Sequence, residues 1–234
     1  MSMRSLVVAF SMMVAGVAVA EDVYVEYVQS DRTKSHAVNV GYIVKPNTKV
    51  VVDYAFVQTN DVQQRVFGVT GADGSVGLQH YINGSGNLAY ACYNNSAANW
   101  TALSSATKAT TARRTFIADL PSKYVCAQQG PNHLCSHTHG TQVTNTANHS
   151  LAIFAAHNAS TSLTSNGNYG SVKFYSMQIY EDGQIVMDLW PCKSDGKYCI
   201  KDRLTGRKFY EVNNKTLSGG AEVAPPASVL LFTS

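Results

Sequence analysis

The stretch Ser171–Cys192 reads SVKFYSMQIYEDGQIVMDLWPC and carries the strongest structural signal in the sequence. It contains two runs of β-branched and aromatic residues, Val172–Tyr180 and Gln184–Trp190, which favour a pleated, half-buried surface. Asp182-Gly183 joins the runs and supplies the two positive-φ residues of a type I′ turn, whose twist matches that of paired strands. The sequence therefore predicts a central β-hairpin.

Short strands separated by turn signals continue through the rest of the chain. We expect them at residues 23–28, 36–44, 49–57, 64–70, 75–82, 87–93, 112–119, 151–156, 198–200, 208–212 and 228–232. The polar segments 94–111 and 158–170, and the Pro- and Gly-punctuated segment 120–146, are expected to be mostly irregular. No segment after the first twenty residues shows a helical apolar period. The pattern predicts an all-β antiparallel sandwich, jelly-roll or barrel in one domain, residues 21–234.

The composition limits the possible functions. Hydrophobic residues make up 45% of the 234 residues, which is enough for a sizeable core. Only 14% of the residues are charged, the formal net charge is +3, and lysine and arginine form no continuous run. Because a phosphate backbone is usually bound by a basic stripe, we expect no nucleic-acid partner.

The first twenty residues have the features of a secretory signal peptide. Arg4 precedes the apolar run Ser5–Val17, and Ala18-Val19-Ala20 forms a small-x-small cleavage site. The alternative is a membrane anchor, but the run is shorter than the roughly 20 residues that span a bilayer. We therefore expect cleavage between Ala20 and Glu21, and a secreted protein, extracellular or periplasmic, with no further membrane span.

The sequence contains five cysteines, which would lie in an oxidising compartment after export. Cys192 and Cys199 flank a short loop and are candidates for a disulfide, and Cys126 and Cys135 are candidates for a second. Cys92 lies in an alternating segment and is expected to be a buried free thiol. The pairings remain open, because spacing alone cannot fix connectivity.

Four groups of residues occur in the same order in a known family. They are Tyr27–Ser30 with Gly41–Tyr54, Phe67-Gly68 with Tyr81–Leu88, Lys173–Cys192, and Asp202–Tyr210. In these groups the chain resembles the concanavalin-A-like, laminin-G-like jelly-roll domains of bacterial secreted and surface proteins. The resemblance implies a two-sheet antiparallel jelly-roll sandwich and, by analogy, glycan binding. It assigns no catalytic or binding residues, because the similar positions are turns and core strands.

One polar segment has the composition of a sugar-binding platform. Trp100 is accompanied by Tyr93, Asn94, Asn95 and Asn99. Sugar CH groups stack on an aromatic ring while neighbouring amides hold the hydroxyl groups, so these five residues form a candidate ligand site. The alternative is that Trp100 folds back and covers the edge of the core.

A histidine-rich segment is a candidate metal site. His133, His137 and His139 alternate with other residues and would share a face of an extended segment with Cys135. Imidazole and thiolate groups suit zinc or copper. The alternative is that Cys135 forms a disulfide with Cys126 and the three imidazoles bind metal only adventitiously.

Calcium is the other cofactor that we consider, because it is common in related lectin-like folds. It requires clustered oxygen ligands, and the candidates are Asp61, Asp73 and the pair Asn94-Asn95. The sequence contains no EF-hand pattern, so otherwise no cofactor is expected.

Catalysis is not expected. Jelly-roll glycosidases need two carboxylates across the scissile bond, and a Glu-x-Asp-x-Glu triplet is absent, as is a Gly-x-Ser-x-Gly elbow. We therefore predict a secreted, non-catalytic, lectin-like module that binds a glycan or another cell-surface ligand. The alternatives are a structural or adhesive surface protein that binds another protein, and a glycoside hydrolase.

Overall fold

The computed structural model describes most of the chain after the expected signal peptide. The described residues are 22–59, 63–70, 77–93, 100–103, 108–130, 132–138, 142–158, 163 and 169–225. Only the backbone is described at residues 70, 93, 100–102, 132–137 and 158. The expected signal peptide and the strand expected at 228–232 lie outside this part and stay predictions. Within the described ranges, no helix is long and apolar enough to cross a membrane.

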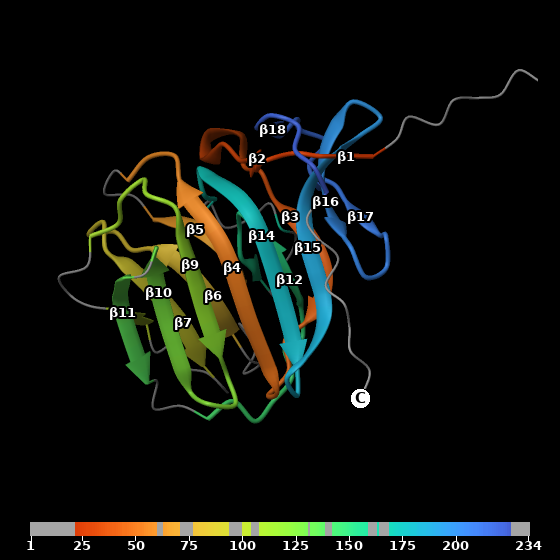
Figure 1. Cartoon of the computed structure of the whole chain (residues 1–234). Coiled ribbons are helices and arrows are strands. Elements are labelled where there is room, and N and C mark those ends of the chain that lie inside the picture. The colour runs from red at the N-terminus through yellow and green to blue at the C-terminus, as the bar shows by residue number, and fades with distance from the viewer. Residues whose placement is uncertain are drawn as a thin grey trace, which may run out of the picture.

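The larger of two sheets lies in front in Figure 1 and has eleven strands in the described part of the chain. They are β1 (Val23–Tyr24), β2 (Val28–Gln29), β4 (Thr48–Phe56), β9 (Arg114–Asp119), β10 (Tyr124–Gln129), β11 (Asn132–Thr138), β14 (Val172–Glu181), β15 (Gln184–Ser194), β16 (Lys197–Asp202), β17 (Lys208–Phe209) and β18 (Ser218–Gly219). The main order is β11-β10-β9-β4-β14-β15-β16-β17, and all pairs are antiparallel. The sheet therefore places β14 at its centre.

The smaller sheet packs behind the larger one (Figure 1). Its described strands are β3 (Val38–Ile43), β5 (Gln64–Thr70), β6 (Gly77–Ile82), β7 (Leu88–Tyr93), β8 (Trp100–Ala102), β12 (Ser150–Ile153) and β13 (His157–Asn158). The order is β3-β12-β5-β6-β7-β8, and the short β13 pairs with β5 in parallel. The expected all-β, two-sheet jelly-roll sandwich is therefore confirmed. A single-turn 3₁₀ helix, Arg32–Lys34, follows the N-cap Asp31.

The central hairpin forms as the sequence predicts. Asp182 has φ 50° and Gly183 has φ 79°, which are the two positive values of the expected turn. β14 pairs with β15 on one side and with β4 on the other, so the backbone groups of this buried strand are satisfied in both directions. The first strand of the predicted hairpin is thus the middle strand of the sheet.

Two segments that were expected to be mostly irregular contain strands. β8 lies within 94–111, and β10 and β11 lie within 120–146. β10 pairs with β9 and β11 pairs with β10, so each extends an edge that earlier strands provide. Strand formation here depends on pairing with this edge more than on local propensity, which explains why the sequence prediction was wrong for these segments.

The hydrophobic core lies between the two sheets and follows the alternation of the strands. In β3 and the residue after it, Val38, Val40, Tyr42 and Val44 are buried, as the sequence predicts for one face. The largest fully buried side chains come from both sheets and include Tyr54, Phe56, Phe67, Tyr90, Phe116, Phe154 and Phe174.

The described residues can test two of the three expectations about the cysteines, and both are confirmed. Cys192 and Cys199 form a disulfide, and Cys92 is a buried free thiol whose pKa is raised to about 12 by burial. The bridge expected between Cys126 and Cys135 stays a prediction, because the side chain of Cys135 lies outside the described residues. The register places Cys126 opposite Ser136 and Cys135 opposite Ala127.

A histidine occupies the middle of the core. His80 Nδ1 lies 3.0 Å from the carbonyl oxygen of Ala89 and therefore donates to it, while Nε2 accepts from the Tyr54 hydroxyl at 2.6 Å. The imidazole stacks on the ring of Phe116 with centroids 3.8 Å apart. Complete burial, opposed in part by the Ala89 contact and reinforced by the charge of Arg114, lowers the pKa of His80 to about 3.

This buried imidazole predicts a pH dependence of stability. The unfolded chain protonates His80 near pH 6.5, whereas the folded chain does so near pH 3. Between these values the unfolded state binds the extra proton, so acidification lowers the free energy of unfolding by about 1.4 kcal/mol per pH unit from this group. Urea titrations between pH 4 and 7 should show a shallower slope in His80→Gln than in the natural protein. Equal slopes in the two proteins would contradict the lowered pKa of His80.

A second buried polar group lies at the base of the β15–β16 hairpin. The Asp188 carboxylate is fully buried and accepts hydrogen bonds from Arg203 Nε at 2.6 Å and from Trp190 Nε1 at 2.9 Å. The Arg203 guanidinium lies over the Trp190 ring, 5.2 Å from its centroid, and its side chain is only 11% exposed. The Arg203 backbone N–H also donates to the Asp188 carbonyl oxygen. This ion pair therefore fixes the turn after β16 against β15.

Removal of this carboxylate should destabilise the protein strongly. In Asp188→Ala the nearly buried Arg203 loses its counter-charge, which costs about 3–5 kcal/mol of unfolding free energy in comparable cases. The matched control is Asp53→Ala, which breaks an ion pair with Arg113, a side chain that is 55% exposed. An exposed pair contributes about 0–1 kcal/mol. If urea denaturation gives similar losses of unfolding free energy for the two variants, the buried Asp188–Arg203 pair contributes no more than the exposed pair does.

Candidate functional site

A cleft of about 340 Å³ lies where the tip of the β15–β16 hairpin meets the segment after β17. All of the residues that line the cleft belong to the described part of the chain, so every lining side chain can be placed. The lining residues are Ser194, Asp195, Lys197, Tyr198, Tyr210, Glu211, Asn214, Lys215, Thr216 and Leu217. Its lining residues belong to β15, β16 and the segment between β17 and β18, and these elements lie together at one end of the larger sheet (Figure 1).

The first wall is a short, cross-linked hairpin. Asp195 and Gly196 form its turn with φ 49° and 76°, the same pair of positive values as in the central hairpin. Cys192 lies directly opposite Cys199 in the register, and the disulfide joins them. The bridge therefore holds the two strands together three residues before the turn, and Tyr198, a lining residue, directly precedes its second cysteine.

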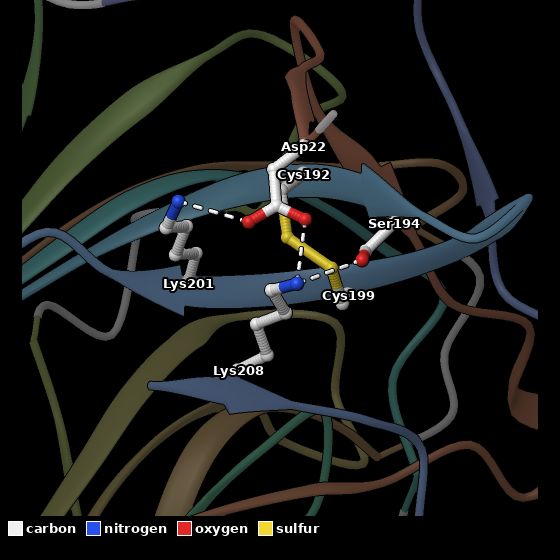
Figure 2. The surroundings of a disulfide bond; sticks show 6 residues. All are labelled: Asp22, Cys192, Ser194, Cys199, Lys201 and Lys208. Atoms are coloured by element: carbon white, nitrogen blue, oxygen red, sulfur yellow. Dashed lines mark hydrogen bonds and ion pairs between the residues drawn. A yellow bond between two sulfur atoms is a disulfide. The ribbon is translucent and has the colours of Figure 1, made fainter. Parts of the chain in front are cut away.

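The N-terminal strand secures the side of this hairpin. Figure 2 shows Asp22 between two lysines, with Lys201 Nζ 3.0 Å and Lys208 Nζ 2.6 Å from its carboxylate oxygens. Lys208 also donates to the Ser194 hydroxyl at 2.9 Å. The contact with Lys208 is the main reason why the pKa of Asp22 is well below its ordinary value. These contacts tie Asp22, the residue before β1, to β16 and β17, and Lys208 in turn to Ser194 of β15, so they hold the strands of the first wall together.

The second wall is held by a glutamate. Glu211 Oε1 accepts from the Ala37 N–H at 3.3 Å, and Oε2 accepts from the N–H groups of Asn213 at 2.8 Å and Lys215 at 2.7 Å. The Val212 N–H donates to the Ala37 carbonyl oxygen at 3.0 Å. These contacts fold residues 211–215 into a loop that is fixed to the segment before β3.

A glycine packs against one of the aromatic rings that line the cleft. β18 pairs with β2, and its residue Gly219 lies against the ring of Tyr198. A Cβ at this position would collide with that ring, so glycine allows the close approach. Tyr198 is half-buried as a result, and the neighbouring Leu217 is buried.

The cleft combines aromatic rings with exposed polar groups. Tyr210 is 41% exposed, and the side chains of Lys197, Asn214 and Thr216 are exposed beside it. An exposed ring offers a stacking surface for CH groups, while ammonium, amide and hydroxyl groups can bind ligand oxygens. The arrangement suits a polar ligand with an apolar face.

The predicted Trp100 site cannot be built from the described side chains. The backbone of Trp100 lies in β8 opposite Ala91, and Tyr93 ends β7, but neither side chain is described. Asn94, Asn95 and Asn99 lie outside the described residues. These five residues therefore stay a prediction, with the register showing that Trp100 and Tyr93 belong to adjacent strands.

The predicted metal ligands also stay a prediction. His133 and His137 lie in β11, where only the backbone is described, and His139 lies outside the described residues. Asp61 and Asp73, the calcium candidates, also lie outside them, as do Asn94 and Asn95. Among the side chains that the structure describes, no three histidine, cysteine, aspartate or glutamate residues cluster as a metal site.

Sequence reasoning missed the cleft as a binding site. In the sequence its two walls are separated by the second half of β16 and by β17, and Glu211 joins the second wall to the distant segment at Ala37. The available signal was the position of Tyr198 beside a predicted disulfide. That signal is weak, because only the packing of Gly219 and the loop 211–215 makes a cleft next to this ring.

Comparisons with known proteins place the fold. No family model and no curated protein matches the sequence. Among solved structures, a candidate carbohydrate-binding protein from Bacteroides ovatus aligns with 87% of this chain at TM-score 0.52 and 11% identity, and this chain spans 62% of that protein. The CBM40 of a Ruminococcus gnavus sialidase aligns at TM-score 0.41 and 13% identity, over 67% of this chain and 90% of that one. A SAP-like pentraxin from Limulus polyphemus aligns at TM-score 0.42 and 8% identity, over 70% of this chain and 77% of that one. The chain has the concanavalin-A-like jelly-roll fold.

Proposed function

We propose that this protein is a secreted, non-catalytic module that binds carbohydrate in the cleft between Tyr198 and Tyr210. The observation that carries the proposal is the exposed ring of Tyr210 within a cleft that is also lined by exposed hydrogen-bond donors and acceptors. The size of the cleft, about 340 Å³, is within the range of small-molecule sites and suits one or two sugar rings. The fold of the Bacteroides ovatus protein is consistent with this function.

The carboxylates of the cleft favour binding over glycoside hydrolysis. A glycosidase needs one carboxyl group to act as acid and a second to act as nucleophile or base. Both oxygens of Glu211 already accept backbone N–H groups, and this leaves Asp195 as the lining carboxylate that is exposed to a ligand. The cleft therefore lacks the second reactive carboxylate.

A protein partner is the alternative function, and the described surface gives it less support. Such an interface usually needs a contiguous apolar patch of several hundred Å². The large apolar side chains that are exposed among the described residues are Val57, Leu204, Tyr210, Val212 and Val223, each by about two fifths. Val57, Leu204 and Val223 come from separate segments, whereas Val212 lies two residues from Tyr210, which belongs to the cleft itself.

Secretion is part of the proposal and is supported by the disulfide. Cys192–Cys199 forms in oxidising compartments, where carbohydrate ligands of cell surfaces and matrices are also found. The predicted signal peptide would deliver the chain there.

The test is a glycan-array binding assay on mature protein, residues 21–234. Tyr210→Ala should weaken binding about tenfold or more, because a stacked aromatic residue at the centre of a site usually contributes 1.4 kcal/mol or more. The matched control is Tyr175→Ala, which removes a half-buried tyrosine from β14, away from the cleft.

Further measurements in the same assay test the predicted Trp100 site, the metal candidates and the protein-partner alternative. If Trp100→Ala abolishes binding while Tyr210→Ala does not, the ligand site is the predicted Trp100 platform and the cleft assignment is wrong. Loss of binding in EDTA would show that calcium or the histidine-rich segment takes part. A blank array for the natural protein would argue against carbohydrate binding and favour the protein-partner alternative.

A further inference from the structure

The charge of the protein is concentrated in the part of the chain that forms the cleft. Residues 193–217 contain seven lysines and arginines and three acidic residues. The remaining residues contain eleven basic and twelve acidic side chains. The formal net charge of +3 therefore arises from this 25-residue segment, which begins at the end of β15 and includes both walls.

Two of the three acidic residues in this segment are buried and hydrogen-bonded. Asp202 is 1% exposed and accepts hydrogen bonds from the Asp188 and Leu204 N–H groups and from the Thr205 hydroxyl. Glu211 is 9% exposed and accepts the three N–H groups described above. Asp195, at the hairpin turn, is thus the exposed carboxylate of the segment.

Three lysines at the cleft have no carboxylate partner among the described residues. Lys197 and Lys215 line the cleft and are exposed, and neither forms an ion pair in the described part of the chain. The Lys215 ammonium donates to the carbonyl oxygen of Lys34, a neutral group. Lys193 lies over the ring of Tyr198, 5.8 Å from its centroid. The more distant Lys201 and Lys208 share the single carboxylate of Asp22.

We propose that the ligand of this cleft is an acidic carbohydrate, a sugar that carries a carboxylate or sulfate group. Its ring would stack on Tyr210, and its acidic group would meet the ammonium groups of Lys197 and Lys215. The inference rests on the proposed carbohydrate-binding function and specifies its ligand class. Lysines without a carboxylate partner beside an aromatic ring favour such a ligand, because each ammonium group can form an ion pair with its acidic group that a neutral sugar cannot provide.

The experiment compares matched neutral and acidic sugars by calorimetric titration of the mature protein. One pair is an oligogalacturonide and its methyl ester, in which methylation removes the charge of the carboxyl group. The other pair is dextran sulfate and dextran of equal length, so the two pairs distinguish a carboxylate from a sulfate. At low ionic strength the acidic member of at least one pair should bind about fivefold tighter or more, and salt should reduce this difference.

Variants that remove a positive or a negative charge from the cleft test the role of its charge directly. Lys197→Gln and Lys215→Gln should each weaken binding of the acidic member about two- to fivefold, and Asp195→Asn should strengthen it by a similar factor. Asparagine is well suited to the positive φ of residue 195, so this variant keeps the turn. Lys123→Gln, in the turn between β9 and β10, is the matched control and should leave binding of the acidic member unchanged.

The outcomes separate the inference from the function on which it rests. Equal binding of neutral and acidic members, with both weakened by Tyr210→Ala, would overturn the acidic ligand and keep carbohydrate binding. Tight binding of a duplex oligodeoxynucleotide that Tyr210→Ala leaves unchanged would overturn it in favour of general attraction for polyanions. Failure of all four sugars to bind would count against both the ligand class and the function.

Discussion

The pairing of β14 with both β4 and β15 determines how the larger sheet is assembled. β14 is the strand through which the two halves of the larger sheet are joined, since β9, β10 and β11 follow β4, and β16 and β17 follow β15. Its inward side chains Phe174, Met177 and Ile179 are fully buried. A one-residue slip of this strand would turn them to the opposite face, so the hydrophobic pattern fixes the register of the whole sheet.

The cleft is a consequence of the same strand arrangement. β15 has eleven residues and extends to Ser194, beyond its last pairing with β14 at Met177↔Leu189. The extension pairs with β16 and β1, and the disulfide joins it to β16. A hairpin that projects beyond a rigid sheet and is cross-linked near its tip can present Tyr198 and Lys197 in a fixed position, which reduces the entropy cost of ligand binding.

The sequence predicts the elements whose signals are local. Asp182-Gly183 and the flanking β-branched residues indicate the central hairpin without knowledge of any other segment, and the alternation in β3 identifies its buried face. β10 and β11 were missed because their strand state depends on the edge of β9, which is formed only in the folded sheet. The cleft was missed for a related reason: Glu211 reaches Ala37 across 174 residues, and no local pattern indicates that contact.

The distribution of carboxylates gives the cleft its electrostatic character. Elsewhere in the described part of the chain, the carboxylates of Glu181 and Asp53 pair with the exposed cations of Lys45 and Arg113. In residues 193–217 the carboxylates of Asp202 and Glu211 instead hold backbone N–H groups inside the protein. Their negative charge is then used to shape the loops, while Lys197 and Lys215 remain exposed at the cleft. The same hydrogen bonds that build the walls thereby leave the lysines available to an anion.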